Sequence, residues 1–206
     1  DREALKKIKE TYADIIISAG SSVAFINRLA ASALGAKSVV ILRPNAPLRK
    51  FDLSIIPSHD RISADDSVII KGALSYPENT AEKSEKCKKF FNLDSSRKVS
   101  FFCGGYLSDK KMYFENLRLF LTELKEFTRK NSFKLLISTS RRTQKEIEEL
   151  VEKEVRGFKN LEAIVVAGRQ NYDFVFEGFV SSSEIVFVSS ESISMISEVL
   201  AFKKPC

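Results

Sequence analysis

The sequence has only one histidine, His59, and only three cysteines, Cys87, Cys103 and Cys206. A single imidazole excludes a metal site built from several histidines, and it excludes any catalytic triad that does not use His59. Three widely spaced cysteines suggest neither a disulfide framework nor a Cys-x-x-Cys metal site, which indicates a reducing compartment. We therefore expect a cytoplasmic protein without a metal site.

Long apolar runs are also missing. No stretch approaches the roughly 18 apolar residues that a membrane-spanning helix needs. Residues 1–10, DREALKKIKE, lack the apolar segment of a signal peptide. Any attachment to a membrane is therefore expected to be peripheral.

Two common nucleotide-binding motifs are absent as well. Neither G-x-G-x-x-G nor the P-loop pattern occurs anywhere in the chain. This absence weakens an interpretation as an ordinary dinucleotide-dependent enzyme or a P-loop NTPase.

The net charge of +6 is unevenly distributed, because residues 1–85 carry a net +1 and residues 86–206 a net +5. Such an excess suits an anionic small ligand or an acidic membrane surface. The basic residues lie mostly on amphipathic helical stretches rather than in one dense block, so a plain solvated surface is the alternative. Nucleic acid is not an expected partner.

Short apolar runs alternate with helical periodicity along the 206 residues. Strands are expected at residues 13–19, 37–42, 53–56, 67–70, 98–103, 133–138, 161–166 and 184–188. The alternation predicts an α/β fold with two Rossmann-like parallel-sheet domains. The polar, lysine-rich residues 76–89 suggest a boundary between domain 1–85 and domain 86–206. The pattern breaks off at both ends, so we expect sequence to be missing there.

Ligands of parallel sheets bind at the carboxyl ends of the strands, which directs attention to the residues that follow each strand. Arg141 and Arg142 follow one strand, and Thr143 with Glu146 forms a T-x-x-E capping box for the next helix. A helix N-terminus beside two guanidinium groups is suited to a diphosphate. The alternative is that both arginines are solvated surface residues.

A serine-rich stretch, residues 189–197, follows the last expected strand and opens a helix. Its hydroxyls suit phosphate oxygens, and Ser194 and Glu198 share one helix face because they are four residues apart. The Glu198 carboxylate could accept both hydroxyls of a ribose. Serine capping with one exposed glutamate is the alternative.

Two further strand ends carry candidate residues. Gly104-Gly105 permits close backbone approach to a ligand, although a plain strand-to-helix turn is the commoner explanation of such a pair. His59 next to Asp60 can act as a general base whose carboxylate neighbour orients it, or it can be a hydrogen-bonded loop histidine.

Taken together, these stretches resemble motifs of the mitochondrial fission ELM family. The similar stretches keep the order and spacing of the family from about residue 12 to the end: FDLSIIPSHD, SVIIKGALS, FFCGG, STSRRT, Gln170-Asn171-Tyr172 and SSESISMISEVLAFKKP. STSRRT is the most distinctive of them. Two positions depart from the family pattern. Glu191 replaces an aspartate, and no proline follows Asn171.

The resemblance implies a GT-B-like, metal-independent glycosyltransferase. The second domain would hold a nucleotide-diphosphate sugar as donor substrate, with no further cofactor and with an unknown acceptor. The implied sugar-nucleotide contacts are Gly104, Gly105, Ser140, Arg141, Arg142, Thr143, Asn171, Ser192, Ser194 and Glu198. The implied catalytic residues are His59 and Asp60, facing a cleft from the first domain.

Two other functions fit the same sequence. One is a non-catalytic adaptor that binds a partner at a membrane surface, because family members in plants are associated with mitochondrial fission. The other is a nucleotide-sugar epimerase, because some epimerases share the GT-B-like fold. The arginines, the serines and Glu198 match the family motifs, which favours a ligand-binding protein over an adaptor without a ligand site.

Overall fold

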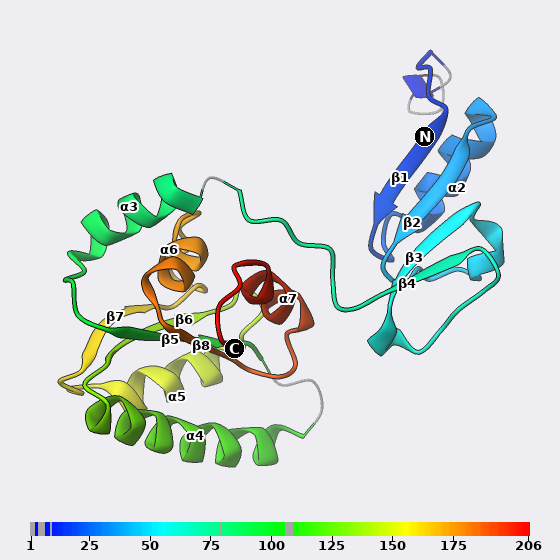
Figure 1. Cartoon of the computed structure of the whole chain (residues 1–206). Helices are drawn as coiled ribbons and strands as arrows, with labels where there is room; N and C mark the ends of the chain where they lie inside the picture. The colour runs from blue at the N-terminus through cyan, green and yellow to red at the C-terminus, as the bar shows by residue number, and fades with distance from the viewer. Residues whose placement is uncertain (1–2, 4–6, 9, 79, 106–108) are drawn as a thin grey trace. The chain divides into compact units, whose positions relative to one another are not determined.

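The computed structural model describes residues 3, 7–8, 10–78, 80–105 and 109–206 (Figure 1). Its contacts divide the chain into two compact units, Asp1–Ala73 and Leu74–Cys206. The expected boundary between residues 85 and 86 falls inside helix α3 (Thr80–Phe91), which belongs to the second unit. The structure thus divides the chain earlier than the sequence suggested.

Helix α3 forms where the sequence suggested a polar connection between domains. Lysines and glutamates dominate the stretch, and its buried face is small because it consists of Ser84 and Cys87 with half-buried Phe91 beside them. This face packs against helix α6 (Val175–Ser182), and Lys83 on α3 forms an ion pair with Glu177 on α6. The helix is therefore stabilised by tertiary packing rather than by a strong amphipathic pattern of its own.

The first unit is a parallel sheet of four strands in the order β1-β2-β3-β4. In its register Ile17 lies beside Val39, and Val39 beside Leu53. Helix α2 (Ala24–Leu34) ends at Gly35, with φ at +66° and a hydrogen bond from the Gly35 N–H to the Ala31 carbonyl. The elements are β1 (Ile15–Ala19), α2 (Ala24–Leu34), β2 (Lys37–Ile41), η1 (Leu48–Lys50), β3 (Leu53–Pro57), η2 (Ser58–Asp60) and β4 (Ser67–Ile70).

The second unit is a parallel sheet of four strands in the order β7-β6-β5-β8. Its strands and helices alternate as the sequence predicts. After α3 they are β5 (Lys98–Cys103), α4 (Lys110–Lys130), β6 (Lys134–Thr139), α5 (Lys145–Val155), β7 (Leu161–Val165), α6, β8 (Ile185–Val188) and α7 (Ile193–Ala201). The order reverses between β5 and β8, which places a switch point, and hence a crevice for a ligand, at their carboxyl ends.

Helices cover both faces of the second sheet (Figure 1). Phe101 of β5 packs with α4 and α5, and its neighbour Phe102 packs on the opposite face with α6 and α7. Successive side chains of a strand point to opposite faces, and every residue of β5 is buried, so the strand contributes to the core on both. This two-sided core holds the strand ends in fixed positions.

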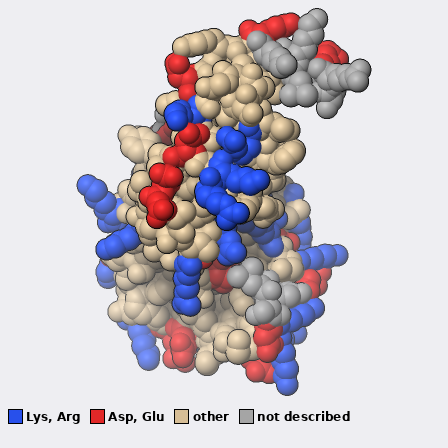
Figure 2. Space-filling view, turned by 90° about the vertical axis from the view of Figure 1, so that its right-hand side faces the viewer, with Lys and Arg blue, Asp and Glu red and all other residues tan. Residues whose placement is uncertain are grey.

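Charged side chains are spread over the surface. On the face drawn in Figure 2, Lys and Arg side chains are scattered among a larger area of uncharged residues, with Asp and Glu between them. Several are paired, including Arg97 with Glu184 and Arg169 with Glu152. General surface charge therefore marks no ligand site by itself. Within the described part of the chain, no helix is long and apolar enough to cross a membrane.

Candidate functional site

Seven of the residues singled out from the sequence line one cavity of about 280 Å³ in the second unit. They come from three segments that follow strands β6, β7 and β8. The seven are Ser140, Arg141, Arg142, Asn171, Ser192, Ser194 and Glu198. Phe102, Val175, Phe176 and Met195 add apolar surface to the same cavity. We call this cavity the arginine pocket.

The arginine pocket owes its charge to Arg141 and Arg142, which are both exposed. Among the described residues, neither guanidinium has a hydrogen-bond or ion-pair partner. Their backbone turn is nevertheless fixed, because Ser140 Oγ accepts a hydrogen bond from the Arg142 N–H at 3.2 Å and the Thr143 N–H donates to the Ser140 carbonyl at 3.0 Å. A rigid turn thus carries two cationic groups whose donors are available to an anion.

Thr143 lies beneath this turn rather than in the pocket. Its side chain is buried, donates to the Cys103 carbonyl at 2.9 Å and accepts from the Ser140 N–H at 2.9 Å. The predicted capping box is wrong, because α5 begins only at Lys145 and Glu146 instead accepts a hydrogen bond from Lys110. Thr143 therefore ties the loop after β6 to the end of β5.

Gly104 and Gly105 also have a packing role. A Cβ at Gly104 would overlap the Glu191 carboxylate, and a Cβ at Gly105 would overlap the side chain of Gln144. Glycine at these two positions lets the ends of the Glu191 and Gln144 side chains come close to the backbone after β5, and a larger residue would displace them. Neither glycine lines the arginine pocket, and their contact with a diphosphate stays a prediction.

Helix α7 brings hydroxyls and a carboxylate to the pocket. Ser192 is the N-cap residue of α7, and its side chain makes no cap hydrogen bond, so its hydroxyl is available to a ligand. Ser194 and Glu198 both line the pocket, as their spacing of four residues predicts. Burial, together with the nearby Glu177 carboxylate, raises the pKa of Glu198. Glu198 is thus a half-buried acid facing a polar cavity.

The loop that carries Asn171 is anchored by Glu148, a residue that sequence reasoning missed. Glu148 on α5 is only 5% exposed, and its Oε1 accepts from the Gly168 N–H at 3.0 Å and from Thr139 Oγ1 at 3.1 Å. Thr139 Oγ1 in turn accepts from the Ala167 N–H at 2.8 Å. In the sequence, the only sign of this role is a glutamate beside the apolar face of α5, and this sign is weak.

A family model described as mitochondrial fission ELM1 matches residues 2–206. The chain belongs to this family. The resemblance noted in the sequence is thereby confirmed over nearly the whole chain. No curated protein matches this family member in sequence.

Solved structures match the ELM1-family chain in fold. The UDP-GlcNAc 2-epimerase of Methanocaldococcus jannaschii is 17% identical with a TM-score of 0.63, and the alignment covers 100% of this chain and 64% of the epimerase. The UDP-GlcNAc 2-epimerase of Neisseria meningitidis, with UDP-GlcNAc bound, is 16% identical with a TM-score of 0.61, covering 99% and 61% of the two chains. The ELM1-family chain therefore spans less than two thirds of these enzymes. The likeness confirms the expected α/β, GT-B-like fold.

His59 and Asp60 of the ELM1-family chain lie in η2, directly after β3, where the sequence placed them. His59 is exposed and Asp60 half-buried. Both belong to the first unit, whereas the arginine pocket is formed by the second. Their catalytic role stays a prediction. Among the described residues, no group of three or more His, Cys, Asp or Glu side chains could hold a metal ion.

Proposed function

We propose that the arginine pocket binds the nucleoside diphosphate part of a nucleotide sugar, and that the protein is a glycosyltransferase using this sugar as donor. The observation that carries the proposal is the meeting of Arg141 and Arg142, without counter-ions among the described residues, with the hydroxyls and carboxylate of α7 in one cavity. The pocket therefore offers positive charge and hydrogen-bonding groups to the same ligand.

The diphosphate would lie between the arginine turn and the start of α7. Guanidinium groups form strong charge-assisted hydrogen bonds with phosphate oxygens. The first N–H groups of a helix, with the positive end of its dipole, add further donors. Ser192 and Ser194 supply hydroxyls on this side of the pocket. These groups would neutralise the diphosphate without a metal ion.

The ribose would lie against Glu198, one turn inside α7. An ionised carboxylate accepts hydrogen bonds only, which suits the two hydroxyls of a ribose. Burial raises the pKa of Glu198 but leaves one face of the residue on the pocket. Ser194, on the same helix face, would hold the phosphate next to the ribose.

Three solved structures support this assignment. The epimerases of M. jannaschii and N. meningitidis share the fold, and the latter structure contains UDP-GlcNAc. A Staphylococcus aureus protein, MnaA, with UDP bound, matches with a TM-score of 0.54 at 14% identity. A nucleotide sugar built on UDP is therefore the first donor to test.

Epimerisation of a nucleotide sugar is the second candidate function, because both UDP-GlcNAc 2-epimerases are structural neighbours.

The three candidate functions differ in their chemistry. In the transferase, the acceptor hydroxyl would lose its proton to His59, the only imidazole in the chain. In an adaptor, nucleotide sugar would neither be transferred nor isomerised. The reaction products separate the three functions.

The experiment is a thermal-shift and calorimetric screen of nucleotides and nucleotide sugars with the full-length protein, followed by product analysis with the best donor. A transferase releases nucleoside diphosphate in the presence of acceptor, and an epimerase yields an isomeric nucleotide sugar. For a transferase, His59→Ala should leave donor affinity unchanged and lower turnover by about 10²–10⁴. Binding without turnover in the parent protein would leave only the adaptor.

A further inference from the structure

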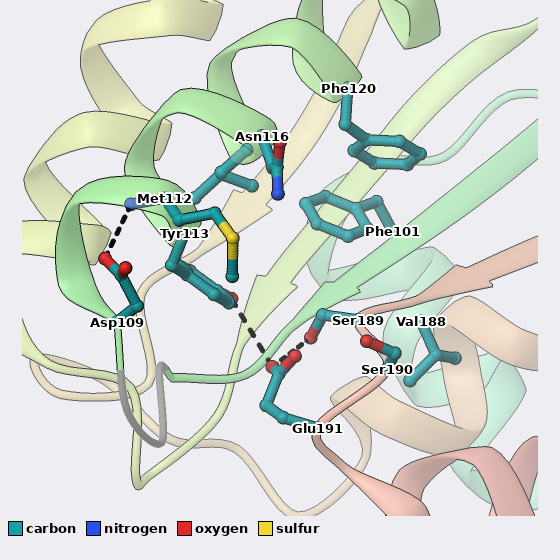
Figure 3. A pocket seen from close by; sticks show the side chains of 11 residues that line it. Phe101, Asp109, Met112, Tyr113, Asn116, Phe120, Val188, Ser189, Ser190 and Glu191 are labelled. Atoms are coloured by element: carbon teal, nitrogen blue, oxygen red, sulfur yellow. Dashed lines mark hydrogen bonds between the residues drawn. The ribbon is translucent and has the colours of Figure 1, made fainter.

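A second cavity, of about 490 Å³, lies at the carboxyl end of β5. Phe101 lines this cavity, whereas its neighbour Phe102 lines the arginine pocket on the opposite face of the sheet. The loop after β8 also separates the two cavities, because Glu191 lines the second cavity and Ser192 lines the arginine pocket. We call it the α4 pocket, since Met112, Tyr113 and Phe120 of α4 form much of its wall (Figure 3). None of the functions considered above uses it.

The polar end of the α4 pocket is a carboxylate held in one orientation. Glu191 Oε1 accepts hydrogen bonds from Ser189 Oγ at 2.5 Å and from the Tyr113 hydroxyl at 3.4 Å, as Figure 3 shows. Ser189 Oγ itself accepts from the Gly104 N–H at 2.6 Å. Burial raises the pKa of Tyr113 well above its usual range, so this hydroxyl stays a donor.

One oxygen of this carboxylate is left for a ligand. Within the described part of the chain, Glu191 Oε2 has no hydrogen-bond partner. Oε1 is held by the Ser189 hydroxyl, with a longer contact to the Tyr113 hydroxyl, which also donates to the Gly104 carbonyl at 3.2 Å. A carboxylate oxygen fixed in this way accepts a donor without first losing conformational freedom. The α4 pocket therefore presents a pre-oriented acceptor.

The remaining wall of the α4 pocket is apolar. The rings of Phe101 and Phe120 pack with their centroids 4.8 Å apart, and Met112 lies across from them with 56% of its surface exposed (Figure 3). An aliphatic group placed here would cover these side chains and remove apolar surface from water. The cavity volume also falls within the usual range for small-ligand pockets.

The charge of the side chains that line the α4 pocket restricts which polar group of a ligand can bind there. Two carboxylates, Asp109 and Glu191, line the α4 pocket, and none of the described residues that line it is Lys, Arg or His. An anionic head group would meet like charge, whereas an amine or hydroxyl would meet acceptors. The arginine pocket has the opposite preference.

We propose that the α4 pocket binds an amphiphile with an aliphatic body and a head group that donates hydrogen bonds, either an amine or a hydroxyl. The aliphatic body lies along Phe101, Met112 and Phe120, and the head group donates to Glu191 Oε2. This site does not depend on nucleotide binding in the arginine pocket.

The sequence itself supplies the reporters for a test, because its only two methionines are Met112 and Met195. Met112 lines the α4 pocket and Met195 the arginine pocket. With ¹³C-methyl-methionine protein, octylamine and octan-1-ol should shift the Met112 signal saturably and leave Met195 in place. Octylamine should bind at least about tenfold tighter than butylamine, because each buried methylene adds affinity.

Head-group selectivity is tested with octanoate and with Glu191→Gln. Octanoate should bind at least about tenfold more weakly than octylamine, and Glu191→Gln should weaken octylamine about tenfold but octan-1-ol at most about twofold. Glu115→Gln, an exposed carboxylate on the same helix outside the pocket lining, is the control and should bind like the parent.

Several results would overturn the proposal. They are an unmoved Met112 signal up to the solubility limit of the probes, equal affinities for octanoate and octylamine, and equal effects of the two glutamine variants. The comparison of octylamine with octanoate uses the parent protein, so it remains decisive even if Glu191→Gln does not fold. If the arginine pocket does not bind nucleotides, added nucleotide will not shift the Met195 signal. The results expected for the α4 pocket will be unchanged.

Discussion

Glu148 on α5 accepts a hydrogen bond from the backbone N–H of Gly168, 3.0 Å away in the loop after β7. The bond joins a buried carboxylate to the loop that brings Asn171 to the arginine pocket. Because Thr139 donates to the same oxygen, one carboxylate fixes the ends of two neighbouring strands. Part of the architecture of the pocket therefore depends on a residue outside it.

Glu148→Ala should lower both stability and nucleotide affinity. Leaving the buried Thr139 hydroxyl without its acceptor costs about 1–3 kcal/mol of unfolding free energy, and the freed loop should weaken nucleoside diphosphate binding several-fold. Chemical denaturation and calorimetry measure the two effects. Glu149→Ala, an exposed neighbour on α5, is the control and should change neither quantity appreciably. Equal behaviour of the two variants would leave Glu148 without a role in holding the loop.

The raised pKa of Glu198 predicts opposite pH effects on stability and on binding. Between the unfolded and the higher folded pKa, the folded protein binds more protons, so this group makes stability fall as pH rises through that window. Glu198→Gln should remove this fall and leave the unliganded protein more stable at neutral pH. Thermal denaturation across the acidic to neutral range measures it. A variant that is less stable than the parent at neutral pH would contradict the assignment.

The affinity for a nucleoside diphosphate should depend on pH in the opposite direction from stability. In the proposed site, ribose hydroxyls would donate to the ionised form of Glu198, so nucleoside diphosphate affinity should fall as pH drops through the raised pKa. Pyrophosphate lacks the ribose and should not share this fall. Glu198→Gln should accordingly weaken a nucleoside diphosphate more than pyrophosphate. Equal losses for both ligands would place Glu198 near phosphate instead.

Gly178 on α6 faces Cys87 on α3 so closely that a Cβ at Gly178 would overlap the cysteine side chain. Gly178→Ala should therefore force α3 and α6 apart and cost about 1–3 kcal/mol of unfolding free energy, typical of overpacking. Ser181→Ala, at a half-buried position on the same helix, is the control. Urea denaturation compares them. A stabilised Gly178→Ala variant would show that alanine's helix preference outweighs the contact.

The sequence predicts the strands and most helices correctly because Ile- and Val-rich runs such as residues 15–17 are short, apolar and followed by turn residues. It fails at α3, where the buried positions are a serine and a cysteine among lysines, so no apolar period is visible. It fails again at Thr143, because a hydroxyl that bonds across to Cys103 is unavailable as a helix cap.

The candidate site was also only partly predictable from the sequence. The rule that ligands bind after parallel strands selects Arg141 and Arg142. The spacing from Ser194 adds Glu198, the family resemblance adds Asn171, and all four line one pocket. Glu148 was missed because its partners, the Gly168 N–H and the Thr139 hydroxyl, lie on other elements of the fold. The α4 pocket was missed because its walls come from residues that also form the core.

The most direct test of nucleotide binding in the arginine pocket is a UDP titration monitored at the methionine methyl groups. The account predicts a saturable shift of Met195 with Met112 unmoved. Affinity should fall at least about tenfold in Arg141→Ala and in Arg142→Ala, because each loses a charge-assisted contact. Arg156→Ala, an exposed arginine outside the pocket lining, should bind like the parent. An unmoved Met195 with UDP and every other nucleoside diphosphate, or equal affinities in all three variants, would contradict the account.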